Sequence, residues 1–181
     1  ASRWRIWTTT RAFENFGMTR PGAVVSNTGP LIALSSIGRL NLLETLYGSI
    51  LVPEGVFQEI TVDGRSRAGA AEVAAVAWIS RVRLPRLPDA LLLNEVGLGE
   101  AEAITLAVHE GARLLLIDDR TARRIAEVSY GLRVKGAAGI LVAAKHQGLI
   151  SAVRPLLEAM REGGYYLSAR LIDAACRYAQ E

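Results

Sequence analysis

The sequence predicts an α/β domain with a central parallel sheet flanked by helices on both faces. The chain has 181 residues, half of them apolar, which is enough for one compact domain with a full-sized core. From residue 23 onward, short apolar runs alternate with longer stretches of helical pattern. Strands that are separated by helices pair in parallel through right-handed crossovers. We therefore expect a single domain over residues 23–181.

The first residues do not share this pattern. Residues 1–22 contain aromatic and charged side chains without periodicity, and Met18 lies among them. We expect residues 1–22 to form an N-terminal extension, with Met18 as the candidate for the natural start of the protein. The intact mass of the protein from its native host tests this hypothesis, since residues upstream of Met18 would exclude it as the start.

Composition excludes several classes of protein. No apolar run approaches the roughly 20 residues that cross a bilayer, and the opening segment lacks the apolar core of a secretory signal. Cys176 is the only cysteine, so no intrachain disulfide can form, and no cysteine and histidine cluster has zinc-ligand spacing. These features predict a cytoplasmic protein without membrane spans or structural zinc.

The positive charge of the chain is carried almost entirely by arginine. The formal net charge is +3, and Lys135 and Lys145 are the only lysines. Arginine presents a planar fork of donors that matches phosphate, which suits an anionic partner such as RNA. A GC-rich genome would produce the same bias, and composition leaves both explanations open.

The elements expected in the first half follow from the apolar runs and the breakers between them. Pro30 stands at a tolerated first-turn position of a helix, and Pro53 ends a strand and begins the next helix, which carries Glu59. Arginine alternates with apolar residues at 79–84, as in a strand near a sheet edge. The expected order is a strand at 23–26, helices at 30–38 and 40–47, a strand at 49–52, helices at 54–60 and 70–78, and a strand at 79–84.

The second half repeats the alternation more closely. The segment before residue 100 is punctuated by prolines and glycines and leads into a strong helix that Gly111 ends. The expected elements are that helix at 100–111, a strand at 113–117, a helix at 121–130, a strand at 132–134, a helix at 136–147, and two helices after Ser151 that Gly163 and Gly164 separate.

Polar side chains follow two of the expected strands directly. Asn27 comes after the first strand, and Asp118 and Asp119 come after the strand RLLLI. Because ligands of parallel sheets bind outside the carboxyl ends of the strands, we expect these side chains to share one edge. Glu59 and Glu100, on neighbouring helices, can join them. Oxygen ligands of this kind suit Mg²⁺ or Mn²⁺.

Each acid also has a plainer interpretation. Glu100 stands at a helix start, where the helix dipole favours a negative charge, and Glu59 can be a solvent-facing helical residue. One of the two aspartates can cap the following helix. Glu102 lies two residues beyond Glu100 and points away from it, which favours a solvated or capping role. The joint placement of the acids, rather than any single one, predicts the metal site.

The motifs of the chain resemble the PIN-domain family. The segments that carry the resemblance are VVSNTGPLIALSSIGRL, VPEGVFQEI, GLGEAEAITLAVHEGARLLLIDDR and LRVKGAAGILVAAKHQGLI. The GEAEAI helix and the strand ending in a double Asp are most similar to the VapC-like branch. The resemblance implies a PIN-like fold, metal-dependent ribonuclease activity and membership of a type II toxin–antitoxin pair, with a small antitoxin protein and a homodimer as partners.

The resemblance also implies roles for particular residues. The first acid of the family falls on Asn27, the second on Glu59, the third on Glu100 with Glu102 as the weaker choice, and the fourth on Asp118 or Asp119. The departure is Asn27, which offers a metal a carbonyl oxygen but no charge, so metal affinity and activation of water should fall. The alternative function is therefore a catalytically weakened PIN domain that binds RNA or protein.

A run of arginines follows the aspartate pair. Arg120, Arg123 and Arg124 are spaced three and four residues apart, which places them along one side of a helix. They are candidate RNA-binding residues beside the site, and an ordinary solvated helix face explains them equally well. A phosphoacceptor receiver domain fits poorly, since its acidic pair should follow the first strand, and neither a dinucleotide-binding glycine motif nor a P-loop is present.

Overall fold

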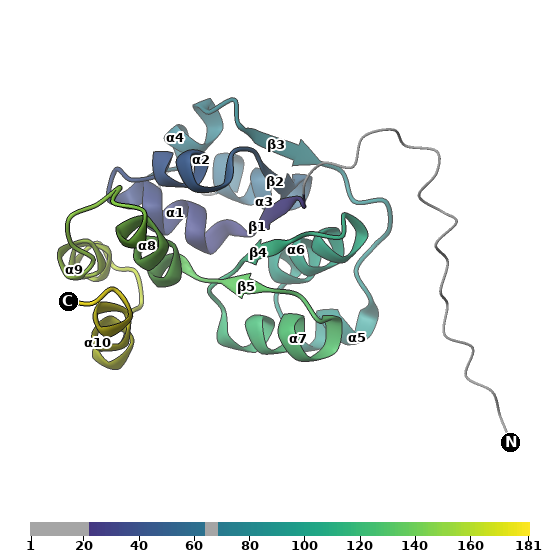
Figure 1. Ribbon diagram of the computed structural model, residues 1–181. Coiled ribbons are helices and arrows are strands. Elements are labelled where there is room, and N and C mark those ends of the chain that lie inside the picture. The colour runs from purple at the N-terminus through teal and green to yellow at the C-terminus, as the bar shows by residue number, and fades with distance from the viewer. Residues whose placement is uncertain (1–21, 64–68) are drawn as a thin grey trace, which may run out of the picture.

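The computed structural model of the protein describes residues 22–63 and 69–181 and confirms the α/β class. Its five-stranded sheet has the order β3-β2-β1-β4-β5, and every pair of neighbours is parallel (Figure 1). The strands are β1 (Val24–Ser26), β2 (Ile50–Pro53), β3 (Ile79–Val82), β4 (Leu114–Leu116) and β5 (Val134–Lys135). Met18 and residues 1–21 of the expected extension lie outside the described residues.

Helices cover both faces of the sheet, as the sequence predicts (Figure 1). One face carries α1 (Thr28–Ser36), α2 (Asn41–Tyr47), α3 (Glu54–Gln58), α4 (Ala70–Ala75), α8 (Ala137–His146), α9 (Arg154–Glu162) and α10 (Ala169–Tyr178). The other face carries α5 (Ala90–Glu95), α6 (Leu98–His109) and α7 (Arg120–Tyr130). None of the helices in these described ranges is long and apolar enough to cross a membrane.

Side-chain alternation along the strands divides the core into two clusters. Val24 packs with the first set of helices and its neighbour Val25 with the second. Leu116 and Leu115 divide in the same way on β4. Successive strand residues point to opposite faces, so a strand covered on both sides must be apolar at every position. This requirement explains the uninterrupted apolar runs of the sequence.

Several boundaries differ from the sequence-based expectations. Helix α1 begins at Thr28 rather than Pro30, and Pro53 is the last residue of β2 rather than the first beyond it. Strand β3 ends at Val82, which leaves Arg83 outside the strand. A proline is tolerated at a strand end because no ladder hydrogen bond is needed from it there.

Two local features were not predicted. The Pro- and Gly-punctuated segment contains α5, whose first turn Asp89 caps by accepting a hydrogen bond from the Leu91 N–H at 2.8 Å. The expected helix at 54–60 changes character: α3 ends at Gln58, and Glu59 begins a π-helical turn, η1 (Glu59–Asp63). Such turns inside helices often occur at functional sites.

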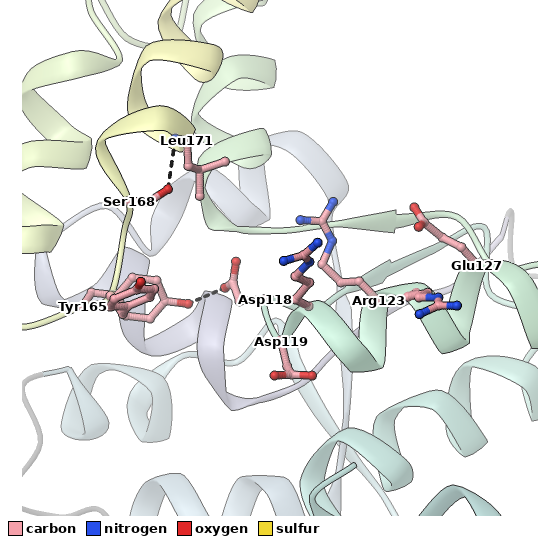
Figure 2. A pocket seen from close by; sticks show the side chains of 10 residues that line it. Asp118, Asp119, Arg123, Glu127, Tyr165, Ser168 and Leu171 are labelled. Carbon is pink, nitrogen blue, oxygen red and sulfur yellow. Dashed lines mark hydrogen bonds between the residues drawn. The ribbon is translucent and has the colours of Figure 1, made fainter. Parts of the chain in front are cut away.

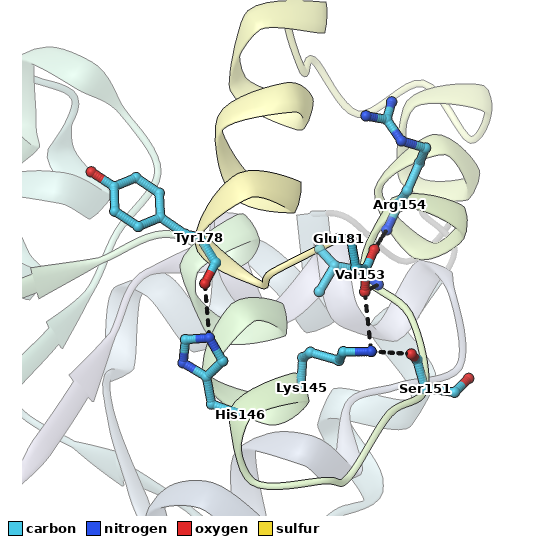
Figure 3. A network of polar contacts seen from close by, with 7 residues as sticks. All are labelled: Lys145, His146, Ser151, Val153, Arg154, Tyr178 and Glu181. Atoms are coloured by element: carbon cyan, nitrogen blue, oxygen red, sulfur yellow. Dashed lines mark hydrogen bonds and ion pairs between the residues drawn. The ribbon is translucent and has the colours of Figure 1, made fainter.

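The last helices are tied to the rest of the molecule by polar contacts around Glu181 (Figure 3). The Glu181 carboxylate accepts hydrogen bonds from the Val153 and Arg154 N–H groups, at 2.7 and 3.3 Å, and so satisfies the start of α9. The Lys145 ammonium lies 3.5 Å from the same carboxylate and also donates to the Ser151 carbonyl. These contacts join the ends of α8, α9 and α10.

The two-sided core makes a test of the fold possible within one helix. Ile104 of α6 is fully buried, whereas Leu98 of the same helix is 61% exposed. We expect Ile104→Ala to lower the free energy of unfolding by about 2–5 kcal/mol, since it removes methyl groups and leaves a cavity. Leu98→Ala should change it by less than about 0.5 kcal/mol. Urea unfolding followed by circular dichroism measures both, and equal losses would contradict the described packing.

Candidate functional site

The candidate site lies at the carboxyl ends of β1 and β4, where the strand order reverses. The chain passes from β1 to β2 on one side and later returns to place β4 on the other side of β1. Ser26 pairs with Leu116, and the Asn27 N–H donates to the Leu116 carbonyl at 3.1 Å. The residues after both strands therefore lie at one edge, as expected. A reversal of this kind opens a crevice, because the two connecting chains diverge.

Asn27 is a deeply buried polar residue of the site. It is 3% exposed, and its Nδ2 donates to Glu100 Oε1 at 3.3 Å. Its Oδ1 is buried and accepts no hydrogen bond from the residues that the structure describes. A 180° rotation of the amide would exchange its oxygen and nitrogen and place Oδ1 next to Glu100 Oε1, so that two acceptors would face each other. A buried acceptor without a donor costs about 1–3 kcal/mol, so this oxygen is suited to a cation or a donor supplied from outside the chain.

Glu100 and Asp119 line one cleft of about 320 Å³ together with Gly97. The Glu100 carboxylate folds back over the start of α6, where a Cβ on Gly97 would lie 2.5 Å from Glu100 Oε2. Asp119 Oδ1 accepts from the Ala122 N–H at 2.7 Å and caps α7, as one of the two aspartates was expected to do. The second Asp119 oxygen makes no hydrogen bond to the described residues. Glu100 and Asp119 thus present carboxylate oxygens to the same space.

Asp118 points away from Asp119 and is held by contacts within the protein (Figure 2). Its Oδ1 accepts from the Ala137 N–H at 2.8 Å, and its Oδ2 accepts from the Tyr165 hydroxyl at 2.6 Å. Burial raises the pKa of Asp118, while these two hydrogen bonds and the nearby Arg123 act in the opposite direction. Burial and the Asp118 carboxylate raise the pKa of Tyr165, which keeps its hydroxyl a donor. Asp118 therefore links β4 to α8 and to the segment before α10.

Glu59 reaches the same edge from the π-helical turn. Its Oε2 accepts from the Thr28 hydroxyl at 2.9 Å, and a Cβ on Gly99 would lie 3.3 Å from that oxygen. Thr28 is bonded to Asn27 in the chain, so Glu59 and Glu100 contact consecutive residues at the end of β1. The structure thus brings Glu59 into the neighbourhood of the buried amide.

Glu102 faces another element. Its carboxylate lies against Gly55, at the start of α3, and its Oε2 is buried and accepts no hydrogen bond from the described residues. Burial raises the pKa of Glu102, the nearby Val56 N–H lowers it, and the nearby Glu59 raises it further. Glu102 thus faces Gly55 whereas Glu100 faces Gly97, so the two carboxylates diverge as expected, but the buried Glu102 Oε2 is neither solvated nor engaged in a cap among the described residues.

The donors at the site fit a hard divalent cation by their chemistry. They are carboxylate and amide oxygens, which Mg²⁺ and Mn²⁺ prefer, and one of them is the unpartnered Asn27 Oδ1. Over residues 22–63 and 69–181, no group of three carboxylates, histidines or cysteines is arranged to hold a metal by itself. A cation bound at this edge would therefore have to combine carboxylate oxygens with the Asn27 amide oxygen.

A second cleft, of about 850 Å³, adjoins the aspartate pair (Figure 2). It gathers all three arginines that the sequence singled out, Arg120, Arg123 and Arg124. Tyr165, Tyr166 and Ser168 line the same cleft. Sequence reasoning missed these residues, because they follow a Gly–Gly break far from every motif and only the fold brings them to the aspartates.

Comparison with known proteins identifies one family. A family model described as a PIN domain matches residues 23–181. No curated protein and no solved structure matches the chain.

The Tyr165–Asp118 contact can be tested by removing one hydroxyl. We expect Tyr165→Phe to lower the free energy of unfolding by about 1–3 kcal/mol, because it leaves a desolvated carboxylate oxygen without its donor. Tyr47→Phe is the matched control, since the Tyr47 hydroxyl is buried and has no hydrogen-bond partner among the described residues. Urea unfolding measures both variants, and a loss for Tyr47→Phe as large as that for Tyr165→Phe would contradict this assignment.

Proposed function

This chain belongs to the PIN-domain family, and from that membership we propose that it is a metal-dependent endoribonuclease that uses Mg²⁺ or Mn²⁺. PIN domains are nucleases that act on nucleic acids, which accounts for acids at the carboxyl edge of a parallel sheet. The observation that carries the proposal is the buried, unpartnered Asn27 Oδ1 beside Glu100. An acceptor in this position is explained by a cation that binds there.

We assign the metal to Asn27, Glu100 and Asp119, with Glu59 as a further carboxylate at the same edge. Asp119 is favoured over Asp118 because it shares a cleft with Glu100 and keeps one oxygen unengaged within the described residues. Asp118 uses both oxygens in hydrogen bonds and acts as a positioning residue. Thr28 orients Glu59 through its hydroxyl.

The proposed reaction is hydrolysis of an RNA phosphodiester. A bound divalent cation lowers the pKa of a water and neutralises charge on the phosphate. The chain's own contribution is to orient the ligands and to hold the substrate: Arg120, Arg123 and Arg124 face the cleft beside Asp119, where they can bind phosphates. No side chain needs to act as a covalent nucleophile.

Asn27 supports a second candidate function. An amide brings no negative charge, so a site with Asn27 binds Mg²⁺ more weakly than one with Asp. The alternative is therefore a PIN domain that keeps the RNA- or protein-binding surface and has lost most of its activity.

The biological setting that we propose rests on the motifs that resemble the VapC-like branch. It is that of a cytoplasmic toxin in a type II toxin–antitoxin pair, inhibited by a small antitoxin and active as a homodimer. We also propose that residues 23–181 form the PIN-like domain alone and that residues 1–22 are an extension to it. Light scattering during size-exclusion chromatography tests the dimer, and a strict monomer would contradict it.

Cleavage of a panel of structured RNAs tests the nuclease proposal. We expect the natural protein to cut with Mn²⁺ or Mg²⁺, to stop in EDTA, and to lose at least about a hundredfold in rate as Glu100→Gln, because that variant replaces a charged ligand. Asn27→Asp should cut faster at low metal concentration, since it restores a charge.

Two results decide between the candidate functions. Activity in Asn27→Asp but not in the natural protein would favour the binding module. Equal activity of Glu100→Gln and the natural protein would attribute the cleavage to a contaminant and refute the assigned site.

The cleft lined by Arg120, Arg123 and Arg124 (the arginine cleft) leads to a separate prediction about RNA affinity. Arg123→Ala combined with Arg124→Ala should weaken RNA binding and reduce the slope of log Kd against log salt by roughly 0.7 for each lost phosphate contact. Arg133→Ala, an exposed arginine outside the cleft, is the matched control and should leave the slope unchanged. Fluorescence anisotropy at several salt concentrations measures both, and an unaltered slope in the double variant would contradict phosphate binding by this helix.

A further inference from the structure

An exposed tyrosine stands at the junction of two clefts beside the aspartate pair. Tyr166 is 91% exposed, and it lines both the arginine cleft and a groove of about 690 Å³ between α8 and α10. We propose that Tyr166 stacks on a base of single-stranded RNA whose phosphate lies on Arg123, and so sets the path of the strand toward the candidate site. This inference rests on the proposed function, since it concerns the same substrate.

The phosphate half of this site is indicated by Arg123. Its guanidinium lines both clefts, and its Nε is buried without a hydrogen-bond partner in the described part of the chain. Asp118, an acid whose pKa burial raises and the nearby Arg123 lowers, has both oxygens engaged by Ala137 and Tyr165. A donor that is desolvated and unused within the protein suits an anion that enters from the cleft.

The base half is indicated by Tyr166 and its surroundings. The neighbouring Tyr165 is fixed by its hydrogen bond to Asp118, so the backbone that carries Tyr166 is held in place. The Tyr166 ring itself remains in solvent. Tyr178, which is 75% exposed, and Leu171, which is 41% exposed, line the same groove as Tyr166 and add to its apolar surface. Aromatic rings exposed along a cationic groove are the usual platform on which single-stranded bases stack.

Charge and position favour RNA over a protein segment or a second copy of the chain. The cleft next to Tyr166 is lined by three arginines and three acids, namely Arg120, Arg123, Arg124, Asp118, Asp119 and Glu127. A phosphate backbone can pair with these arginines, which an apolar peptide cannot do. A duplex hides the faces of its bases, so stacking on Tyr166 requires an unpaired strand.

Binding of a short fluorescein-labelled oligouridine, measured by anisotropy in EDTA so that no cleavage occurs, tests the inference. We expect Tyr166→Ala to raise Kd about 5- to 100-fold, as loss of one stacked base does, and Tyr166→Phe to stay within about twofold of the natural protein. The salt slope of Tyr166→Ala should match that of the natural protein, because stacking releases no counterion. Tyr130→Ala, an exposed tyrosine outside both clefts, is the control.

Three results would overturn the inference. The first is an unchanged Kd for Tyr166→Ala, and the second is a Kd of the natural protein for the single strand that is no lower than for a duplex of the same sequence. The third is a dimer that Tyr166→Ala dissociates, which would make the groove a protein interface. Failure of this inference can be distinguished from failure of the proposed function. RNA cleavage by the natural protein, with an unchanged Kd for Tyr166→Ala, would refute only the stacking. RNA binding that depends on Tyr166, without metal-dependent cleavage, would refute only the nuclease activity.

Discussion

The parallel pairing of β1 with β4 is the constraint on which the candidate site depends. The hydrogen bond from the Asn27 N–H to the Leu116 carbonyl continues this ladder one residue beyond β1. It places the first polar residue after β1 level with the end of β4, where the aspartates follow. Since β2 and β5 lie on the outer sides of this pair, the helices that leave it diverge and keep the edge open.

The two adjacent aspartates have different physical roles because the chain turns between them. Asp118 faces the α8 side, where a backbone N–H and the Tyr165 hydroxyl satisfy its oxygens. Asp119 caps α7 and faces the cleft of Glu100. The capping hydrogen bond of Asp119 holds the start of α7, and with it the arginines of its first two turns, next to the carboxylates. One pair of residues thereby positions both the acidic and the basic parts of the site.

The amide of Asn27 changes the balance of charge at the edge. An aspartate there would repel Glu100 in the absence of a cation, whereas the Asn27 amide donates to it. The Asn27 amide also lacks the negative charge that an aspartate would offer to a cation at this edge. Asn27 and Glu100 therefore do not repel each other when no metal is bound. Binding of a cation at this edge gains less electrostatic energy than in a site with one more carboxylate.

Much of the fold and part of the site follow from local sequence. Uninterrupted apolar runs predict strands that are buried on both faces, and the alternation of these runs with helical patterns predicts a parallel sheet. The polar residues after the first and fourth strands marked the edge at which Asn27 and the aspartates meet. Helix α5 was missed because its flanking prolines and glycines conceal a single capped helical segment, and the π-helical turn at Glu59 has no periodic signature.

The sequence by itself determined the class of fold, the edge that carries the acids and the family, since these depend on patterns that are local along the chain. Only the tertiary structure distinguishes the contacts of Asp118 from those of Asp119, because Asp118 is held by Tyr165, a partner 47 residues away. It alone also brought Tyr166 to the arginine cleft, since α8, α9 and the turn after them must pack before that tyrosine meets α7. Contacts between distant segments leave no pattern in a single sequence, and for this reason the different contacts of the two aspartates and the place of the tyrosine are visible only in the folded chain.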